Sequence, residues 1–122
     1  MRTILLGAVL LLLAGAADAQ NTRGLLQNTP STLFTDEDNR LFRDTWSKAL
    51  EAAADNQTLS WTNPKTGHGG DLTALRSFEW RGYRCREIQI RNQAQGRKSD
   101  ETLNSCKIDG AWKLLSAEQL RK

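Results

Sequence analysis

The sequence predicts an α+β fold in which one N-terminal amphipathic helix packs on an antiparallel meander of four to five strands, with one disulfide. Three observations predict it. Apolar residues recur at helical spacing after Thr35, strand-like segments separated by turn-forming residues follow, and the chain has only two cysteines. A length of 122 residues allows one such domain and little more.

The first 19 residues read as a secretory signal peptide. A basic Met1-Arg2 start precedes an apolar run over residues 4–15, and Ala17-Asp18-Ala19 fits the small-x-small rule for cleavage before Gln20. The apolar run is shorter than the roughly 20 residues that a membrane span needs. No second apolar stretch follows it, so we expect an exported protein with no transmembrane span in the mature chain.

The helix is predicted to begin after a lead-in over residues 20–34. Thr35 is a good N-cap, and the acidic residues at 36–38 place negative charge where the helix dipole favours it. The pattern predicts that the helix ends near residues 55–56. One apolar face is expected, made of Leu41, Phe42, Trp46, Ala49, Leu50 and Ala53.

After residue 56 the apolar period changes to that of strands. Strands are predicted at residues 59–62, 71–80, 83–91, 102–108 and 111–115. Arg81-Gly82 and Asp109-Gly110 are read as tight turns, and residues 63–70 and 92–98 as loops. The domain is therefore expected to cover residues 35–116, with a charged tail over residues 117–122.

Cys85 and Cys106 fall on neighbouring predicted strands. In an oxidising compartment such a pair is usually a disulfide, and a ring of about 20 residues is worth roughly 3 kcal/mol in the loop-entropy model. A metal site would need three or four ligands, and His68 is the only histidine. We therefore expect a disulfide between Cys85 and Cys106, with no metal and no cofactor.

Charge is distributed unevenly along the chain. Residues 76–98 hold seven basic and two acidic residues, whereas residues 36–55 hold six acidic and three basic ones. An arginine-rich sheet suits bidentate binding of anionic groups on envelope polymers. The alternative is a solvated surface with no ligand. The candidate anion-binding residues are Arg81, Arg84, Arg86 and Arg91.

Other chemistry finds little support in the sequence. His68 and Asp71 could form a general-base pair, but no serine or cysteine stands in a nucleophile setting, so we expect no enzyme. The glycines at 67–70 lack the lysine of a phosphate-binding loop. Trp61 and Trp80 flank this loop and could stack on a sugar, although core positions are favoured. Nucleic acid is not expected as a partner of an exported chain.

Three motifs together resemble the C-terminal domain of the rickettsial-type 17 kDa surface antigen family of Gram-negative envelope proteins. They are a W-x-N-P-x-[ST]-G-x-x-G loop, a G-x-x-C-R-E strand and a C-x-x-x-G-x-W hairpin. The resemblance covers about residues 36–115 and implies the same fold, an envelope location and no catalytic residues. The matching motif positions, besides the cysteines, are Trp61, Asn63, Pro64, Gly67, Gly70, Gly82, Arg86, Glu87, Gly110 and Trp112.

Many members of that family are lipoproteins with a glycine-rich segment, and this chain has neither a lipobox cysteine nor such a segment. We therefore expect a protein of the periplasm, or one held peripherally at the outer membrane. Its expected role is binding or structural, with an envelope polyanion or another envelope protein as partner. The alternative is a periplasmic inhibitor of a secreted hydrolase, with the loop over residues 63–70 as its plug.

Overall fold

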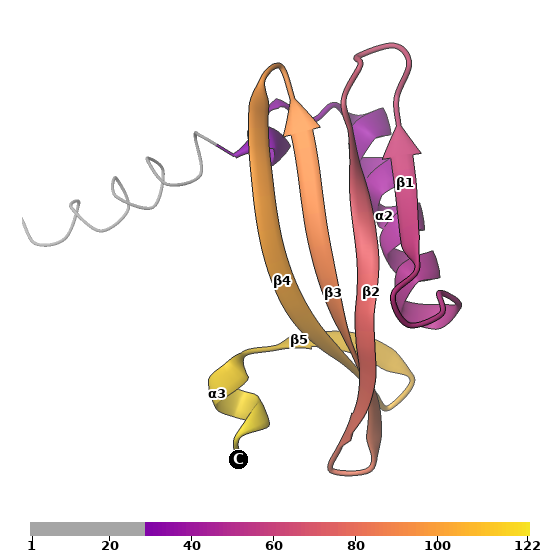
Figure 1. Ribbon diagram of the computed structural model, residues 1–122, viewed down its shortest axis with the longest axis vertical. Coiled ribbons are helices and arrows are strands. Elements are labelled where there is room, and N and C mark those ends of the chain that lie inside the picture. Colours follow the sequence, from indigo (N-terminus) through magenta and orange to yellow (C-terminus); the bar gives the residue numbers. More distant parts are fainter. Residues whose placement is uncertain (1–28) are drawn as a thin grey trace, which may run out of the picture.

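The computed structural model describes residues 29–122, so the predicted signal peptide lies outside the described residues. One long helix packs on a five-stranded antiparallel sheet whose strand order follows the sequence, as Figure 1 shows. The predicted α+β fold is therefore confirmed. The elements are η1 (Pro30–Leu33), α2 (Asp36–Glu51), β1 (Thr58–Thr62), β2 (Gly69–Trp80), β3 (Tyr83–Ala94), β4 (Arg97–Ile108), β5 (Ala111–Leu115) and α3 (Ala117–Leu120).

Helix α2 begins as predicted and ends earlier than predicted. Thr35 and Asp38 form a capping box, in which each side chain accepts a hydrogen bond from the other residue's backbone N–H. The helix stops at Glu51 rather than near residues 55–56. The carbonyls of Ala49 and Leu50, which would continue the helix, accept hydrogen bonds from Arg86 instead.

The three hairpins between β2 and β5 share one turn geometry. Each has two central residues with positive φ, the second a glycine, which suits the right-handed twist of the flanking strands. The central pairs are Arg81-Gly82, Gln95-Gly96 and Asp109-Gly110.

The loop predicted over residues 92–98 is wrong. Strand β3 continues to Ala94 and β4 starts at Arg97, so only Gln95-Gly96 turns. Polar side chains in this segment suggested a loop. On a sheet with one uncovered face, however, polar side chains can point to solvent from a regular strand.

The two faces of the sheet differ in what covers them. Helix α2 packs on one face, behind the sheet in Figure 1, and the core there consists of Ala49, Leu50, Ala53, Trp61, Leu72, Ala74, Ile88 and Ile90. All six predicted apolar residues of the helix belong to this core or pack against it. Phe34 adds to it from the lead-in, with its ring edge-on to Trp61 at 5.1 Å. We call the opposite side of the sheet, which α2 does not cover, the open face.

The predicted disulfide is confirmed. Cys85 and Cys106 lie directly opposite each other on β3 and β4, with their Cα atoms 4.0 Å apart. Both side chains are fully buried on the open-face side of these strands. The bond joins two strands that are already paired, so it constrains the unfolded chain more than it shapes the folded one.

Replacing both cysteines by serine should lower the free energy of unfolding by about 3 kcal/mol, because the unfolded chain regains its loop entropy. Urea unfolding followed by tryptophan fluorescence measures the change. A reducing agent should destabilise the unmodified protein by a similar amount and leave the double variant unaffected. An unchanged midpoint in the variant would show that the bond adds no stability.

Candidate functional site

The loop after β1 wraps around one buried carboxylate on α2. Asp38 has no exposed surface, and it accepts hydrogen bonds from Asn63 Nδ2 at 2.8 Å, Thr66 Oγ1 at 2.9 Å and His68 Nδ1 at 2.8 Å. The backbone N–H of Thr35 donates a fourth at 2.8 Å. Three motif-loop side chains are therefore used to fasten the loop to the first turn of the helix.

The charge of Asp38 is stable in this position. Burial alone would raise the pKa of its carboxyl group, but the hydrogen bonds from Thr35, His68, Asn63 and Thr66 outweigh burial and hold the pKa well below its usual range. An ionised carboxylate can only accept hydrogen bonds, so Nδ1 of His68 must carry a proton and donate it.

The general-base pair that His68 and Asp71 could form is absent. His68 is only 3% exposed and is bonded to Asp38, while Asp71 is exposed on the open face and accepts a hydrogen bond from Ser60. The sequence pattern indicates only that Asp38 lies in the first helical turn. The signal that could have found it is its position as N3 after the Thr35 cap, where a reciprocal capping carboxylate is expected.

Gly70 of the motif and its neighbour Gly69 are both required by close packing. A Cβ atom on Gly69 would lie 2.7 Å from the Trp61 carbonyl, and one on Gly70 would lie 2.9 Å from Trp61 Nε1. The indole of Trp61 donates to Asn92 Oδ1 across the strand between them, at 3.2 Å. Trp61 is 4% exposed, so it is part of the core and is not a sugar platform.

Arg86, one of the four candidate anion-binding residues, is buried beneath the end of α2. It is 1% exposed, and it donates to the carbonyl of Ala49 at 2.7 Å and to Asp55 Oδ1 at 3.2 Å. A guanidinium group at the C-terminus of a helix also meets the negative end of the helix dipole. Its charge is therefore used to hold the helix on the sheet.

The other three arginines do not gather in one place. Arg84 lies on the same face as Arg86, donates to the Glu51 carbonyl and stacks near Trp112. Arg81 occupies the β2–β3 turn, and Arg91 lies on the open face with Nε 3.3 Å from Asp100. The structure thus brings none of the four into a common anion-binding patch.

The remaining motif residues also form turns or contact other residues of the domain. Gly82 and Gly110 provide the positive φ of two hairpin turns, and Gly67 has a φ of 75° in the motif loop, beyond the exposed Pro64. Trp112 donates to Glu51 at 2.7 Å, and Glu87 lies 3.5 Å from Arg76 on the open face. The motifs therefore mark how the domain is held together.

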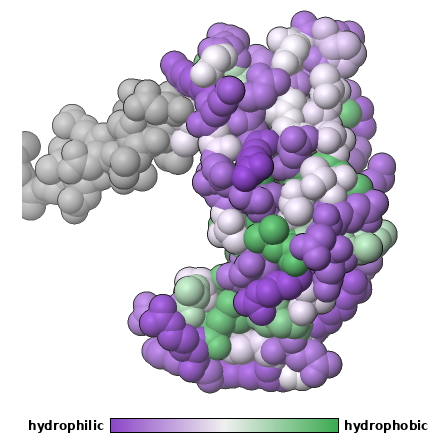
Figure 2. Space-filling view, viewed as in Figure 1, coloured by the Kyte–Doolittle hydropathy of each residue, from purple (hydrophilic) through white to green (hydrophobic). Residues whose placement is uncertain are grey.

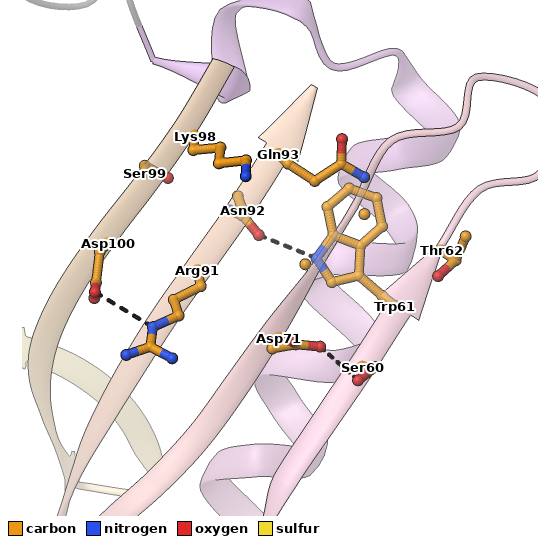
Figure 3. Close-up of a pocket in the computed structure, with 12 residues that line it drawn as sticks. Ser60, Trp61, Thr62, Asp71, Arg91, Asn92, Gln93, Lys98, Ser99 and Asp100 are labelled. Carbon is orange, nitrogen blue, oxygen red and sulfur yellow. Dashed lines mark hydrogen bonds and ion pairs between the residues drawn. The ribbon is translucent and has the colours of Figure 1, made fainter. Parts of the chain in front are cut away.

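The open face carries a hollow with a volume of about 660 Å³ above Gly69 and Gly70 (Figure 3). Its position follows from strand register, because residues directly opposite each other on antiparallel strands share a face. Ser60, Asp71, Arg91 and Asp100 form one row across four strands, and Thr62, Gly69, Gln93 and Lys98 form the next. The missing side chain at Gly69 leaves the centre of the second row open.

The lining of the hollow combines both signs of charge with uncharged polar groups. Asp71 accepts a hydrogen bond from Ser60 at 2.6 Å, and Arg91 contacts Asp100 through Nε alone. Among residues 29–122, the terminal nitrogens of Arg91 and the ammonium of Lys98 have no hydrogen-bond partner. The hollow therefore offers free donors beside carboxylates, an arrangement that suits binding of a polar ligand.

Fold and site together define a small disulfide-linked domain, one helix on a curved sheet, with a polar hollow on its uncovered face. The chain belongs to the family of 17 kDa outer membrane surface antigens, whose sequence model matches residues 48–113. The predicted resemblance is confirmed.

The 17 kDa surface antigen of Rickettsia prowazekii (strain Madrid E) is 29% identical over 83 residues, which cover 66% of this chain and 52% of that protein. This chain therefore spans about half the length of that relative. No solved structure matches the chain. Within residues 29–122 no helix is long and apolar enough to cross a membrane.

Replacing Asp38 by Asn should lower the free energy of unfolding at pH 7 by about 3 kcal/mol, because buried donors lose a charged acceptor. The pKa of Asp38 is lower in the folded than in the unfolded state, so its contribution is full above about pH 4 and is lost as the pH falls further. The variant should therefore lose less stability between pH 5 and pH 2 than the unmodified protein.

Chemical denaturation across this pH range measures both effects. Asp44→Asn, at an exposed carboxylate of the same helix, should change stability by less than about 1 kcal/mol. Equal effects of the two substitutions would contradict the central role of Asp38.

Replacing Arg86 by Met should cost about 3 kcal/mol, because the carbonyl of Ala49 loses its donor and the helix end loses its counter-charge. Arg91→Met, at a side chain that is 63% exposed, should change stability by less than about 0.5 kcal/mol. Urea unfolding of the two variants compares the buried arginine with the exposed one. A fully stable Arg86→Met variant would show that this side chain does not hold the helix.

Proposed function

We propose that this protein is an exported component of the Gram-negative cell envelope, resident in the periplasm or peripheral at the outer membrane, with a non-catalytic binding role. Membership of the outer membrane surface antigen family supports the location. The observation that carries the binding role is the polar hollow on the open face, which has the size of a small-ligand site.

The lining of the hollow favours a ligand of mixed charge over a simple polyanion. Arg91 and Lys98 would hold carboxylates of the ligand, and Asp71 and Asp100 would hold ammonium groups. Ser60, Thr62 and Gln93 add hydrogen-bonding groups for hydroxyls and amides. A wall polymer that carries short peptides on a glycan presents all of these groups, and we infer that such a polymer is the ligand.

Binding of an anionic polymer by Arg81, Arg84, Arg86 and Arg91 together has less support. Arg86 is buried, and Arg91 has a carboxylate beside it. The inhibitor alternative also has less support, because Asn63 and His68 of the loop are buried and bonded to Asp38. Only a few exposed residues of that loop, such as Lys65, are left to enter an active site.

Sedimentation with purified wall sacculi from a Gram-negative bacterium tests the proposal. The protein should sediment with the sacculi, and the double substitution Arg91→Ala and Lys98→Ala should lower the bound fraction severalfold. Lys48→Ala, at an exposed lysine on α2, is the matched control and should bind like the unmodified protein.

A double variant with Asp71→Asn and Asp100→Asn distinguishes a mixed-charge polymer from a polyanion. A mixed-charge polymer loses ammonium contacts, so capture should fall. A polyanion would be held more tightly once the two carboxylates were neutralised, and capture would also fall steeply with salt. Increased capture by this variant, or capture equal in all variants, would overturn the proposal.

A further inference from the structure

The far end of the β2–β3 hairpin combines aromatic and arginine side chains at an exposed tip. In Figure 1 the turn forms the lowest point of the sheet, well away from α2. Trp80 and Tyr83 lie directly opposite each other at the base of the turn, with ring centroids 6.4 Å apart, and both are only partly buried. Their pairing places them together on the open face.

Arginines surround these rings. The guanidinium of Arg81 lies over the Trp80 ring at 4.6 Å, and that of Arg76 lies over the Phe78 ring at 4.4 Å. Residues 76–84 contain three arginines and one glutamate. Arg84 and Glu79 lie on the covered face, so the positive charge at the open-face side of the tip comes from Arg76 and Arg81. In Figure 2 the lowest part of this side, where the turn lies, is mostly hydrophilic, and hydrophobic residues gather above it.

The identity of residue 81 is not explained by the turn. Arg81 has a φ of 52°, in the left-handed region where Asn, Asp or Gly is favoured at this turn position. The equivalent position of the β4–β5 hairpin holds Asp109, with the same φ of 52°. The equivalent position of the β3–β4 hairpin holds Gln95 with a φ of 50°, so a long polar side chain is accommodated at this turn position. Within the domain, Arg81 is held by its contact with the Trp80 ring and by a hydrogen bond that it donates to the carbonyl of Lys122 at 2.6 Å.

We propose that the β2–β3 hairpin tip binds the surface of a membrane that contains anionic phospholipids. Trp and Tyr are the side chains that settle at the headgroup level of a bilayer, with the ring in the apolar region and the polar atom in water. Arg76 and Arg81 supply the positive charge that phosphate headgroups attract, and their planar groups suit phosphate oxygens. Because the tip projects beyond α2, it reaches a flat surface without obstruction from the helix.

The charge balance distinguishes this surface from the hollow. Within residues 29–122, Glu87 beside Arg76 is the acid that pairs with an arginine of the tip, whereas the hollow has as many carboxylates as cations. The tip therefore matches an anionic surface and the hollow does not. The membrane contact stands on its own residues and does not depend on the polymer proposed for the hollow.

Co-sedimentation with lipid vesicles tests the proposal on the oxidised protein. It should bind vesicles of phosphatidylcholine and phosphatidylglycerol in a ratio of 3:1 and fail to bind vesicles of phosphatidylcholine alone. Arg81→Asn should lower the partition coefficient roughly fivefold. Asn suits the turn better, which offsets the lost hydrogen bond to the Lys122 carbonyl, so the thermal unfolding temperature should change little.

Two further variants complete the test. Trp80→Thr keeps a strand-forming residue and should lower binding by a similar factor. Arg43→Gln removes the same charge from the exposed surface of α2 and should change binding less than twofold. The double variant of Arg91 and Lys98 should bind vesicles normally, so a failure at the tip is distinguishable from a failure at the hollow.

Each contrary outcome overturns the proposal. Equal binding to both kinds of vesicle would exclude recognition of anionic headgroups. An equal loss in Arg43→Gln and Arg81→Asn would mean that only total charge matters. Unchanged binding in Trp80→Thr would mean that the tip meets a charged polymer rather than a bilayer interface.

Discussion

The structure depends on one buried carboxylate. Asp38 accepts hydrogen bonds from the helix cap at Thr35 and from three side chains of the loop that follows β1. An ionised group without exposed surface is destabilising unless all its acceptor sites are used, and four donors use them here. The network fixes where the first turn of α2 meets the sheet. It therefore also fixes where Trp61, which directly precedes the loop, enters the core.

Arg86 plays the complementary role at the other end of the helix. Its guanidinium donates hydrogen bonds to the carbonyls of Ala49 and Leu50, and α2 ends at Glu51. One anion at the helix start and one cation at its end both match the helix dipole. The residues that carry the family resemblance thus serve mainly to attach the helix to the covered face. Ligand contacts are better sought on the open face, where the motif residues are few.

Much of the fold could be predicted because its signals are local. The Thr35 cap, the apolar helix face and the turns at Arg81-Gly82 and Asp109-Gly110 each depend on neighbours a few residues apart, and two cysteines allow only one pairing. The partner of His68 could not be predicted in this way, because Asp71 is near in sequence while Asp38 is 30 positions away. The burial of Arg86 could not be predicted for a related reason. The alternation of side chains along β3 assigns Arg86 to the correct face of the sheet. Only the packing of α2 shows that this face is covered at the position of Arg86.

The open face is long enough to hold two separate surfaces, because three long strands cross it. Strands β2, β3 and β4 each have 12 residues, which is about 40 Å at the usual rise per residue. The hollow with balanced charge lies toward one end of them, and the cationic aromatic tip lies at the other. A single binding surface would have no need to separate these two chemistries. Two surfaces at opposite ends of a stiff, disulfide-linked sheet suit a protein that contacts a membrane at one end and a polymer beside that membrane at the other. The helix, which is fastened to the covered face at both of its ends, covers neither the hollow nor the tip.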